Sequence, residues 1–388
     1  MNRKITLLLL LLYACYFHVS AQTPAQTAVL KMQLQGKLDS MQRANGFPGA
    51  TFAAVLPNGE RIAIATGTAD SLTGAPMQPD HRMLSGSNGK TLFTAAALLL
   101  AEQGLFKLDD RIANYIGHEP WFNRIPNAQS ITMRMLLNHT SGIEEYLEHG
   151  DFMQRLKSNP THTWKPVELL AYIFDRKALF EAGTGFSYAD ANYILFSYIL
   201  EKISGRRMYD QIKSDLIKPY GLTATEPSTK RSYAKLAVGY TRAGGPFPVE
   251  GAMVRKGVLT LNPQFEWAGG GFVSNAADLA TWAKAYYDFK AISPALRAEM
   301  RQGVAANTGK NHQYGLAMQL RPGGHAGMGY GHSGWFPGYV TDAAYFPDLN
   351  IAVAMQFNTD NFRLLKRPSE AYLLDMVMVI SRATQTNY

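Results

Sequence analysis

The chain contains a single cysteine, Cys15, among its 388 residues. Cys15 lies in the apolar segment 5–17, which follows a basic pair at residues 3–4 and precedes a small-residue signal, Val-Ser-Ala, that ends at Ala21. This order is typical of a cleaved signal peptide, here residues 1–21. The mature protein is then expected to contain no thiol. That excludes a disulfide framework, a cysteine nucleophile and a thiolate metal site.

Long apolar runs are missing as well. Residues 5–17 are shorter than the about 20 apolar residues that a membrane-spanning helix needs, so we expect no stable membrane span after cleavage. An uncleaved N-terminal anchor is one alternative. A lipoprotein site at Cys15 is another, but the bulky Tyr13 stands where such sites usually have a small residue. The expected location is periplasmic or secreted.

Charged residues of one sign are not in large excess, with 38 lysines and arginines against 30 aspartates and glutamates. Because the sequence has no long basic run, this balance favours solubility or attraction to an anionic cell envelope over nucleic-acid binding. The sequence also lacks a phosphate-binding glycine loop with lysine and a His-Glu-x-x-His motif. We therefore expect no nucleic-acid partner, no cofactor and no metal.

Histidines and acidic residues do gather between residues 139 and 162. They are His139, His149, His162, Glu144, Glu145, Glu148 and Asp151. Their separations favour solvated loop residues over a metal site. His139 itself is interpreted as a structural residue that supports a loop.

Strand patterns occur near both ends of the chain. After a helical segment at residues 25–43, two β-prone runs at 51–56 and 61–66 flank an Asn-Gly turn and predict an antiparallel hairpin. The runs 338–346 and 351–357, around a Pro-Asp-Leu-Asn turn, predict a second hairpin. Residues 92–218 carry mostly helix-period apolar patterns, and a last apolar helix is expected at residues 370–381.

These patterns predict an α/β protein of the α+β type. One antiparallel sheet, flanked by helices, is expected to form from both chain ends, with a mostly helical lobe inserted between them. The mature chain, residues 22–388, is then a single catalytic unit. Its sheet lobe covers approximately residues 22–85 and 250–388, and its helical lobe approximately 86–249.

A serine and a lysine three residues apart open one of the expected helices. Ser87 and Lys90 precede the apolar run 91–103 and share a helix face, so the amine can take the hydroxyl proton and activate the oxygen. The helix N-terminus also favours negative charge there. The spacing alone is weak evidence, because Ser232 and Lys235 show it too, in what we interpret as a surface segment. A helix cap is the alternative role for Ser87.

Two further groups of polar residues follow. Tyr188 and Asp190 lie at the start of an apolar helix at residues 193–203, where the alternative is a core tyrosine and a helix-capping aspartate. Gly-His-Ser-Gly-Trp at residues 331–335 precedes a strand. Its glycines allow close backbone approach to a ligand, and His332 offers a donor or proton carrier. An incidental histidine in a glycine-rich turn is the alternative here.

The order of these motifs resembles that of the penicillin-recognising serine hydrolases, the serine β-lactamase-like superfamily. This group includes DD-peptidases, class C β-lactamases, D-aminopeptidases and related esterases. Three connecting segments are similar too: Gly-Leu-Phe-Lys-Leu-Asp-Asp at 104–110, Leu-Leu-Asn-His-Thr-Ser-Gly at 136–142, and Gly-Gly-Phe-Val-Ser-Asn-Ala-Ala-Asp-Leu at 270–279. The resemblance covers roughly residues 35–360 and implies a β-lactamase/transpeptidase-like fold.

The resemblance also implies catalytic roles. Ser87 attacks a carbonyl and forms an acyl-enzyme, while Lys90 deprotonates it or keeps Tyr188 in a basic state. Tyr188 passes the proton to the leaving group. The backbone N–H groups of Ser87 and Trp335 form the oxyanion hole, which often contributes most to acyl transfer. Whether Lys90 or Tyr188 is the acylation base stays open.

Substrate binding or proton transfer is implied for four more residues, Asp190, His332, Ser333 and Gly334. Two of them depart from the β-lactamase pattern. Asp190 replaces the usual asparagine, and its carboxylate favours a protonated Lys90, which shifts weight toward Tyr188 as the base. His332 replaces the usual lysine, and a mostly neutral imidazole binds a carboxylate less strongly than a fixed cation. Both changes argue against an efficient β-lactamase.

We therefore expect an exported serine hydrolase that acts on a small peptide, amide or ester. D-Ala-D-Ala carboxypeptidase or D-amino-acid peptidase activity is favoured, since peptidoglycan stem peptides fit the compartment. A carboxylesterase or a weak β-lactamase is the alternative, and an aromatic pocket of Trp121, Trp335 and Phe336 would favour esters. A catalytically inactive cell-wall-binding protein is the alternative from another class, although inactive relatives usually lose one of the three catalytic residues.

Overall fold

The computed structural model describes residues 24–245, 247 and 249–385 of the chain. The expected signal peptide, residues 1–21 with Cys15, lies outside the described residues. Within the described part, no helix is both long and apolar enough to cross a membrane.

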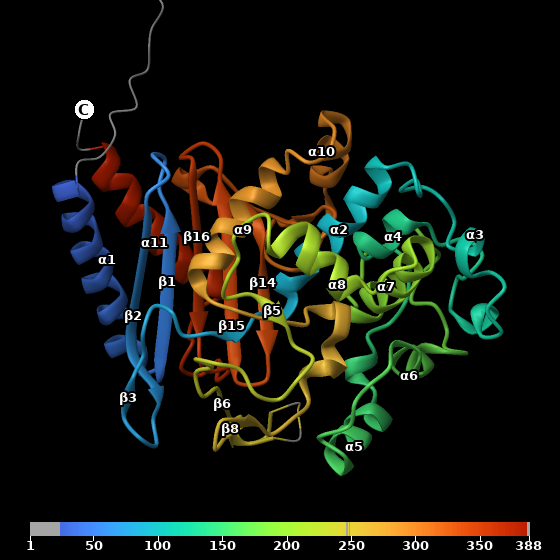
Figure 1. Cartoon of the computed structure of the whole chain (residues 1–388), viewed down its shortest axis with the longest axis horizontal. Helices are drawn as coiled ribbons and strands as arrows, with labels where there is room; N and C mark the ends of the chain where they lie inside the picture. The colour runs from blue at the N-terminus through green and yellow to red at the C-terminus, as the bar shows by residue number, and fades with distance from the viewer. Residues whose placement is uncertain (1–23, 246, 248, 386–388) are drawn as a thin grey trace, which may run out of the picture.

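A nine-stranded antiparallel sheet forms the centre of the molecule (Figure 1). The strands are, in spatial order, β11 (Val304–Ala305), β12 (Gln313–Tyr314), β13 (Gln319–Pro322), β14 (Met328–Phe336), β15 (Tyr339–Phe346), β16 (Ile351–Phe357), β1 (Gly49–Val55), β2 (Arg61–Asp70) and β3 (Ala75–Pro76). The hairpins β1–β2 and β15–β16 confirm the two predicted hairpins. The pairing of β1 with β16 joins the two ends of the chain in one sheet, as the sequence predicted.

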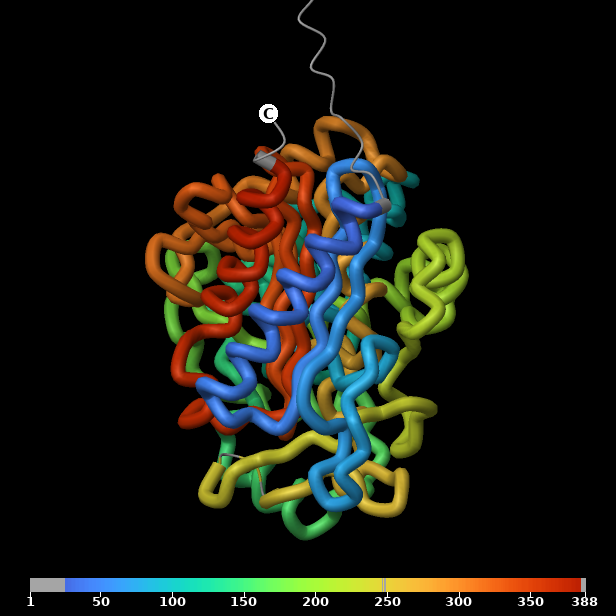
Figure 2. The backbone as a smooth tube through the Cα atoms, turned by 90° about the vertical axis from the view of Figure 1, so that its left-hand side faces the viewer, coloured from blue at the N-terminus to red at the C-terminus, as the bar shows by residue number. Residues whose placement is uncertain are grey.

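Helices cover both faces of this sheet. Helices α1 (Pro24–Asn45) and α11 (Ser369–Gln385) lie side by side on one face (Figure 2), and α9 (Ala276–Asp288) packs on the other. Successive residues of a strand point to opposite faces. Along β1, Phe52 packs with the α1 and α11 layer, whereas Ala53 packs with α9. The sheet is therefore buried on both sides.

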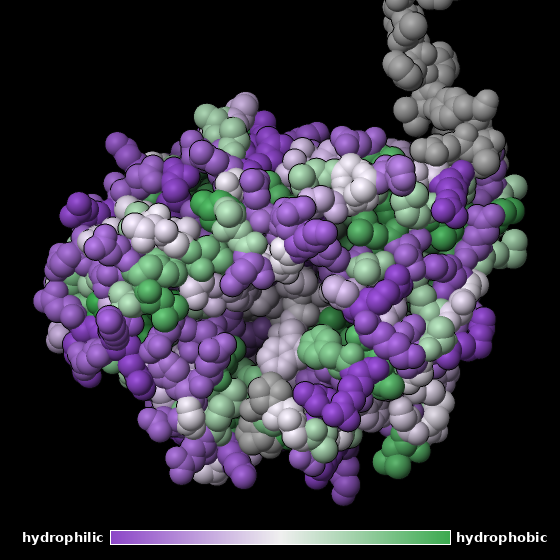
Figure 3. Space-filling view, turned by 180° about the vertical axis from the view of Figure 1, so that it is seen from behind, coloured by the Kyte–Doolittle hydropathy of each residue, from purple (hydrophilic) through white to green (hydrophobic). Residues whose placement is uncertain are grey.

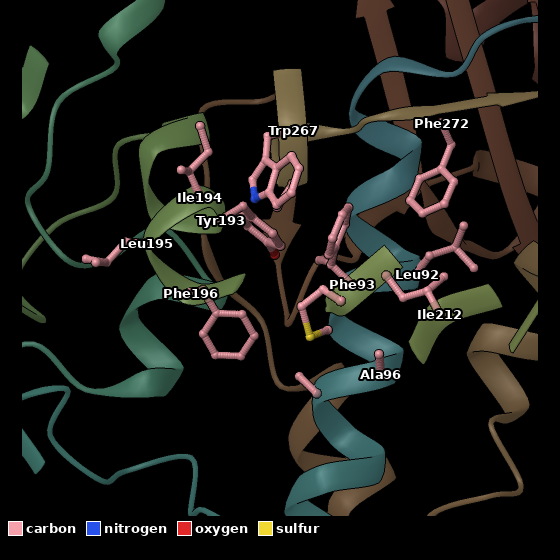
Figure 4. Close-up of a cluster of buried hydrophobic side chains, with 14 of the residues drawn as sticks. Leu92, Phe93, Ala96, Tyr193, Ile194, Leu195, Phe196, Ile212, Trp267 and Phe272 are labelled. Carbon is pink, nitrogen blue, oxygen red and sulfur yellow. The ribbon is translucent and has the colours of Figure 1, made fainter. Parts of the chain in front are cut away.

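The helical region is built around α2 (Lys90–Glu102), whose alanine- and leucine-rich sequence favours a helix. This helix is apolar and buried around most of its circumference. Figure 4 shows its side chains packed between those of α7 (Asp190–Ser204) and the Phe272 segment. The ring of Phe93 contacts Tyr209 and Phe272, with centroids 5.5 and 5.6 Å away. This packing fixes the first turn of α2 relative to the segments that carry Tyr209 and Phe272.

Shorter elements complete the described fold. The helices are α3 (Ala113–Ile116), α4 (Met133–Leu137), α5 (Gly150–Ser158), α6 (Pro166–Leu170), α8 (Met208–Ile212) and α10 (Pro294–Arg301). Three small sheets are formed by β4 (Met83–Leu84), β10 (Phe272–Ser274) and β5 (Glu226–Pro227), by β6 (Tyr240–Thr241) and β7 (Gly251–Ala252), and by β8 (Val254–Arg255) and β9 (Val258–Leu259). Helices α2 to α8 gather on one side of the main sheet (Figure 1).

Phe357 connects the sheet to its helical cover, because its fully buried ring lies 5.1 Å from that of Phe47 and 5.5 Å from that of Tyr372. We expect Phe357→Ala to lower the free energy of unfolding by about 3–5 kcal/mol through the cavity it leaves. Urea denaturation followed by circular dichroism measures this. Phe362→Ala, at a ring that is 58% exposed, is the matched control and should cost less than about 0.5 kcal/mol. An equal decrease in the free energy of unfolding in both variants would contradict the prediction.

Candidate active site

A cavity of about 630 Å³ opens between the helical region and strand β14. Figure 3 shows the molecule hollowed near the centre of one face. The lining contains seven of the eight predicted site residues: Ser87, Tyr188, Asp190, His332, Ser333, Gly334 and Trp335. The eighth, Lys90, is fully buried, and its Nζ lies 2.9 Å from Ser87 Oγ. The structure therefore brings together all the residues that the sequence motifs indicated.

Ser87 lies in a 3-10 turn, Gly86–Gly89, between β4 and α2. It is the one partly exposed residue between Ser85 and Lys90. The turn is tied to the main sheet, since Asn88 Nδ2 donates to Thr341 Oγ1 (2.7 Å) and Thr341 Oγ1 donates to the Ser85 carbonyl (2.6 Å). These bonds hold the Ser87 hydroxyl at the mouth of the cavity.

Two glycines allow β14 to approach this turn closely. Gly86 has φ +52°, and a Cβ at this position would lie only 2.5 Å from the Trp335 backbone nitrogen. A Cβ on Gly334 would lie 2.1 Å from the Ser85 carbonyl oxygen. Any larger side chain at either position would push the strand away from the turn that carries Ser87. The Trp335 backbone nitrogen therefore lies beside Gly86, the residue that precedes Ser87.

The Lys90 ammonium is fully buried and has three acceptors. Its Nζ donates to Ser87 Oγ (2.9 Å), to Asp190 Oδ1 (2.6 Å) and to the Gly269 carbonyl. An ammonium has three N–H donors, so all of them are used. The acceptors come from three separate segments of the chain, and the geometry fits a protonated lysine paired with the Asp190 carboxylate.

Asp190 is the first residue of α7, but it does not cap that helix. The N-cap residue is Ala189, and no side chain caps the helix there. The Asp190 side chain is 8% exposed and points to Lys90 instead. The helix-cap interpretation of Asp190 is therefore wrong, and the predicted closeness of this carboxylate to Lys90 is confirmed.

The Tyr188 hydroxyl is buried and makes no hydrogen bond of normal geometry with the described residues. Its ring packs 4.2 Å from the ring of His139 and lies 4.8 Å from Lys90 Nζ. Burial, together with the charge of Asp190, raises the pKa of the Tyr188 phenol well above its usual value, although nearby Ser87 opposes this rise. Tyr188 is therefore a neutral phenol at the mouth of the site, a form suited to donate a proton.

Two buried histidines are linked through Tyr314. His139 Nδ1 accepts from the Ala189 N–H (3.2 Å), so its Nε2 carries the proton and faces Tyr314 Oη (3.3 Å). Tyr314 Oη donates to His332 Nε2 (2.8 Å), and His332 Nδ1 donates to the Ser333 carbonyl (2.5 Å). Burial, with the charge of Lys90, holds the pKa of each imidazole well below its usual range.

This network has consequences for both histidines. His139 supports the Tyr188 ring and the start of α7, in line with the structural role expected for it. His332 lines the cavity, but both its ring nitrogens are already bonded, so it has no free nitrogen for a substrate in this arrangement. Ser333 Oγ lies 3.3 Å from Gln319 Oε1 and Nε2, and it remains partly exposed to the cavity.

The sequence did not identify two acidic groups that line the cavity, the partly buried Glu145 and the buried Glu266. Glu145 lines the cavity, and its carboxylate accepts the backbone N–H groups of Leu147 (3.0 Å) and Asp190 (2.5 Å). Glu145 is a loop residue as expected, but it is only partly solvated, because its carboxylate binds the backbone at the start of α7. Burial, with the charge of Asp190, raises the pKa of the Glu145 carboxyl to about 8.

Glu266 is the second missed acid. Its side chain is 3% exposed, lines the cavity and leaves Oε2 without a hydrogen-bond partner. Burial, with the charge of Asp190, raises the pKa of Glu266 well above its usual value. A glutamate inside the aromatic run Phe265 to Trp267, just before three glycines, was the available sequence signal.

The structure separates two other sets of residues considered in the sequence. Trp335 and Phe336 line the cavity, whereas the ring of Trp121 stacks on that of Phe174 elsewhere in the helical region, with centroids 5.5 Å apart.

Among the described residues, no group of three or more His, Cys, Asp or Glu could hold a metal ion. Lys235 of the second Ser-x-x-Lys motif has a side chain that is 61% exposed and pairs with Asp80.

Comparison with known proteins places this arrangement in context. The family model described as Beta-lactamase matches residues 34–374. Penicillin-binding protein 4 of Amycolatopsis lactamdurans is 27% identical over 361 residues, which are 85% of this chain and 88% of that protein. A D-aminopeptidase of Brucella anthropi is 24% identical over 80% of this chain, which spans only 56% of that enzyme's length. The solved structure of a D-stereospecific amidohydrolase from Streptomyces sp. has a TM-score of 0.74 and 26% identity, covering 87% of this chain and 97% of that one.

Because the Tyr188 hydroxyl makes no hydrogen bond of normal geometry with the described residues, Tyr188→Phe should leave the thermal unfolding temperature nearly unchanged. We expect it to lower kcat/KM for an activated ester by about 10²–10⁴-fold, the usual contribution of a positioned proton donor. Tyr146→Phe is the matched control, since its hydroxyl donates to the Phe265 carbonyl (2.7 Å). That variant should lose stability, by about 1–3 kcal/mol, without a comparable loss of activity. A destabilised Tyr188→Phe protein with full activity would contradict both expectations.

Glu266 should make stability depend on pH. Its folded-state pKa is raised above the ordinary value of 4.5, so the folded protein holds a proton that the unfolded chain releases above that pH. Its contribution to stability is therefore complete below pH 4.5 and is lost as the pH rises. The unfolding free energy of Glu266→Gln minus that of wild type should increase by up to about 1.4 kcal/mol for each pH unit between pH 5 and 7.

Urea denaturation at constant temperature and several pH values measures this difference. Glu148→Gln, which removes a carboxylate from an exposed position on the same cavity, is the control and should follow the wild-type curve. Parallel pH curves for wild type and Glu266→Gln would show that Glu266 does not titrate abnormally.

Proposed function

This chain belongs to the Beta-lactamase family of serine hydrolases, and on that premise we propose that it cleaves a small peptide, amide or ester through an acyl-enzyme on Ser87. One observation carries the proposal. The Ser87 hydroxyl is the cavity-exposed end of a buried hydrogen-bond network that runs through Lys90 to Asp190. A serine oxygen with a nearby amine that can accept its proton is the basic requirement for nucleophilic attack.

Acylation then proceeds through a series of proton transfers. Lys90 passes one proton to the Asp190 carboxylate and takes the Ser87 proton as Oγ bonds to the substrate carbonyl carbon. Tyr188, a neutral phenol, donates its proton to the leaving group as the scissile bond breaks, and it recovers a proton from Lys90. This order assigns the base to the Lys90–Asp190 pair and the acid to Tyr188. Water attacks the acyl-enzyme by the reverse proton path.

The backbone N–H groups of Ser87 and Trp335 form the oxyanion hole in this proposal. The close approach of β14 at Gly86 and Gly334 supports it, because it puts the Trp335 nitrogen beside the nucleophile turn. Ser333 and Gly334 then line the path of the substrate backbone. His332 holds β14 and Tyr314 in place, and a direct proton-transfer role would require one of its two hydrogen bonds to break.

For the substrate we propose a D-amino-acid peptide or amide, with D-Ala-D-Ala carboxypeptidase activity as the related option. The similarity to a penicillin-binding protein, a D-aminopeptidase and a D-stereospecific amidohydrolase supports this class. The neutral His332 in place of a lysine disfavours efficient β-lactamase activity. The aromatic lining at Trp335 and Phe336 supports an esterase as the second candidate. We propose that the protein acts outside the cytoplasm, after removal of residues 1–21.

Intact mass spectrometry tests the nucleophile. Purified mature protein is incubated separately with a fluorophosphonate and with a penicillin, and the same is done with Ser87→Ala. We expect a phosphonate adduct on the wild type and none on Ser87→Ala. Ser232→Ala is the matched control, because it alters the second Ser-x-x-Lys motif and should be labelled like wild type.

The penicillin arm distinguishes the substrate classes. A penicillin adduct in addition to the phosphonate adduct would support a carboxypeptidase-like site, and a phosphonate adduct alone would favour an aminopeptidase, amidase or esterase. The absence of both adducts from folded wild-type protein would overturn the enzyme proposal in favour of a binding protein.

A further inference from the structure

Trp267 has a backbone conformation that is rare for a residue with a side chain. Its φ is +40° and its ψ is −126°, within the 3-10 segment Pro263–Gly269. Glycine adopts such angles freely, whereas a Cβ is crowded there. Strained backbone of this kind persists only where the surrounding contacts hold it, and it gathers at functional sites. A tryptophan at this position, where a glycine would be unstrained, indicates that the indole has a role of its own.

The Trp267 carbonyl closes a tight loop, residues 267–271, which we call the Trp267 loop. This carbonyl accepts the backbone N–H of Gly271 (2.8 Å). Gly269 lies in the middle of the loop, and its carbonyl accepts from the Lys90 ammonium. The Trp267 loop therefore carries one of the three acceptors that satisfy the buried charge of Lys90.

The backbone of the loop packs directly against the catalytic groups. A Cβ on Gly269 would lie 2.6 Å from Asp190 Oδ2, and a Cβ on Gly270 would lie 2.3 Å from the Gly86 carbonyl oxygen. This packing prevents the loop from moving closer to Asp190 or to the turn that carries Ser87. Repulsion of this kind does not prevent the loop from moving away, so an attractive contact is needed to hold it in place.

The Trp267 indole supplies that contact. Its Nε1 donates to Ser197 Oγ (3.1 Å), and its ring packs against that of Tyr209, with centroids 5.0 Å apart. Figure 4 shows the indole between α7 and α2. Ser197 is buried and lies seven residues after Asp190, which is about two turns along the same face of α7. The indole therefore ties the loop to the helix that also carries Asp190.

We propose that Trp267 is a positioning residue that acts through Lys90. Its indole keeps the Trp267 loop, and with it the Gly269 carbonyl, on the Lys90 ammonium. The ammonium in turn keeps the direction in which it meets the Ser87 hydroxyl. Trp267 is not among the residues that line the cavity, so it acts without touching the substrate. This inference rests on the proposed function, because the position of Lys90 affects a reaction only if Ser87 is acylated.

Single-turnover acylation measures this role. The release of p-nitrophenol from p-nitrophenyl acetate is followed with the protein in excess, which gives a rate constant at saturation and a half-saturating concentration. Ser197→Ala and Trp267→Phe each remove the bond between the indole and the hydroxyl. We expect each to lower the rate constant by about 3–10-fold, the effect of one hydrogen bond, and to leave the half-saturating concentration within about 2-fold of wild type. The rate of fluorophosphonate adduct formation should fall by the same factor.

Two further variants assign the effect to the indole. Ser197→Ala and Trp267→Phe break the same bond, so the double variant should be within about 2-fold of the slower single variant. Single-variant losses that multiply in the double variant would overturn the assignment to this bond. Trp267→Gly has the backbone freedom without the indole, and we expect it to lose at least about 10-fold in rate constant. A wild-type rate constant in Trp267→Gly would overturn the role of the indole.

Ser204→Ala and Trp164→Phe are the matched controls. Ser204 ends the same helix, and its hydroxyl also donates to a carbonyl of that helix, Leu200 (2.8 Å). Trp164 is also fully buried, but its Nε1 makes no hydrogen bond with the described residues. Both variants should acylate within about 2-fold of the wild-type rate constant. A loss equal to that of Ser197→Ala in either control would overturn the inference.

The remaining outcomes separate this inference from the proposed function. Wild-type rate constants in Ser197→Ala and Trp267→Phe, with the fluorophosphonate adduct still on Ser87, would overturn the positioning role and leave the serine hydrolase intact. A change confined to the half-saturating concentration would overturn it as well, because it would place Trp267 in substrate binding. The absence of both ester cleavage and a fluorophosphonate adduct from folded wild-type protein would overturn the proposed function and this inference with it.

Discussion

The buried ammonium of Lys90 is the interaction on which the site depends. It binds Ser87 from the 3-10 turn, Asp190 from the start of α7, and the Gly269 carbonyl. A charge with no solvent contact is tolerated only when all its donors are paired. A shift of α7 or of the Gly269 segment away from α2 would leave that charge unpaired. The same contacts that orient the Ser87 hydroxyl therefore also hold the helical region in one arrangement.

The sheet meets this network under an equally strict steric constraint. Gly86 and Gly334 are the positions where the nucleophile turn and β14 touch backbone to backbone, and neither has room for a Cβ. The bonds from Asn88 to Thr341 and from Thr341 to Ser85 fix the turn to the neighbouring strand. One side of the cavity is thus set by electrostatics around Lys90, and the other by close packing against the sheet.

The resulting site is rich in carboxyl groups and poor in exposed cations. Tyr188 is a neutral phenol, and His332 is a neutral imidazole held between Tyr314 and the Ser333 carbonyl. Proteins that share a fold differ in substrate through the groups that line their sites, and in this cavity those groups include four acidic residues and a neutral histidine.

The sequence alone determined the local elements and the order of the motifs. The Asn-Gly and Pro-Asp-Leu-Asn turns specify the two hairpins, and the alanine- and leucine-rich run after Lys90 specifies α2, because turn chemistry and apolar period act between near neighbours. Only the tertiary structure decided which polar groups share the cavity. From the sequence, Glu145 is interpreted as a solvated loop residue and Glu266 as part of an aromatic run. Their position beside Asp190 depends on how α7 and the Gly269 segment pack around Lys90. Burial and charge pairing arise between residues that are distant in sequence, so a local sequence pattern cannot predict them.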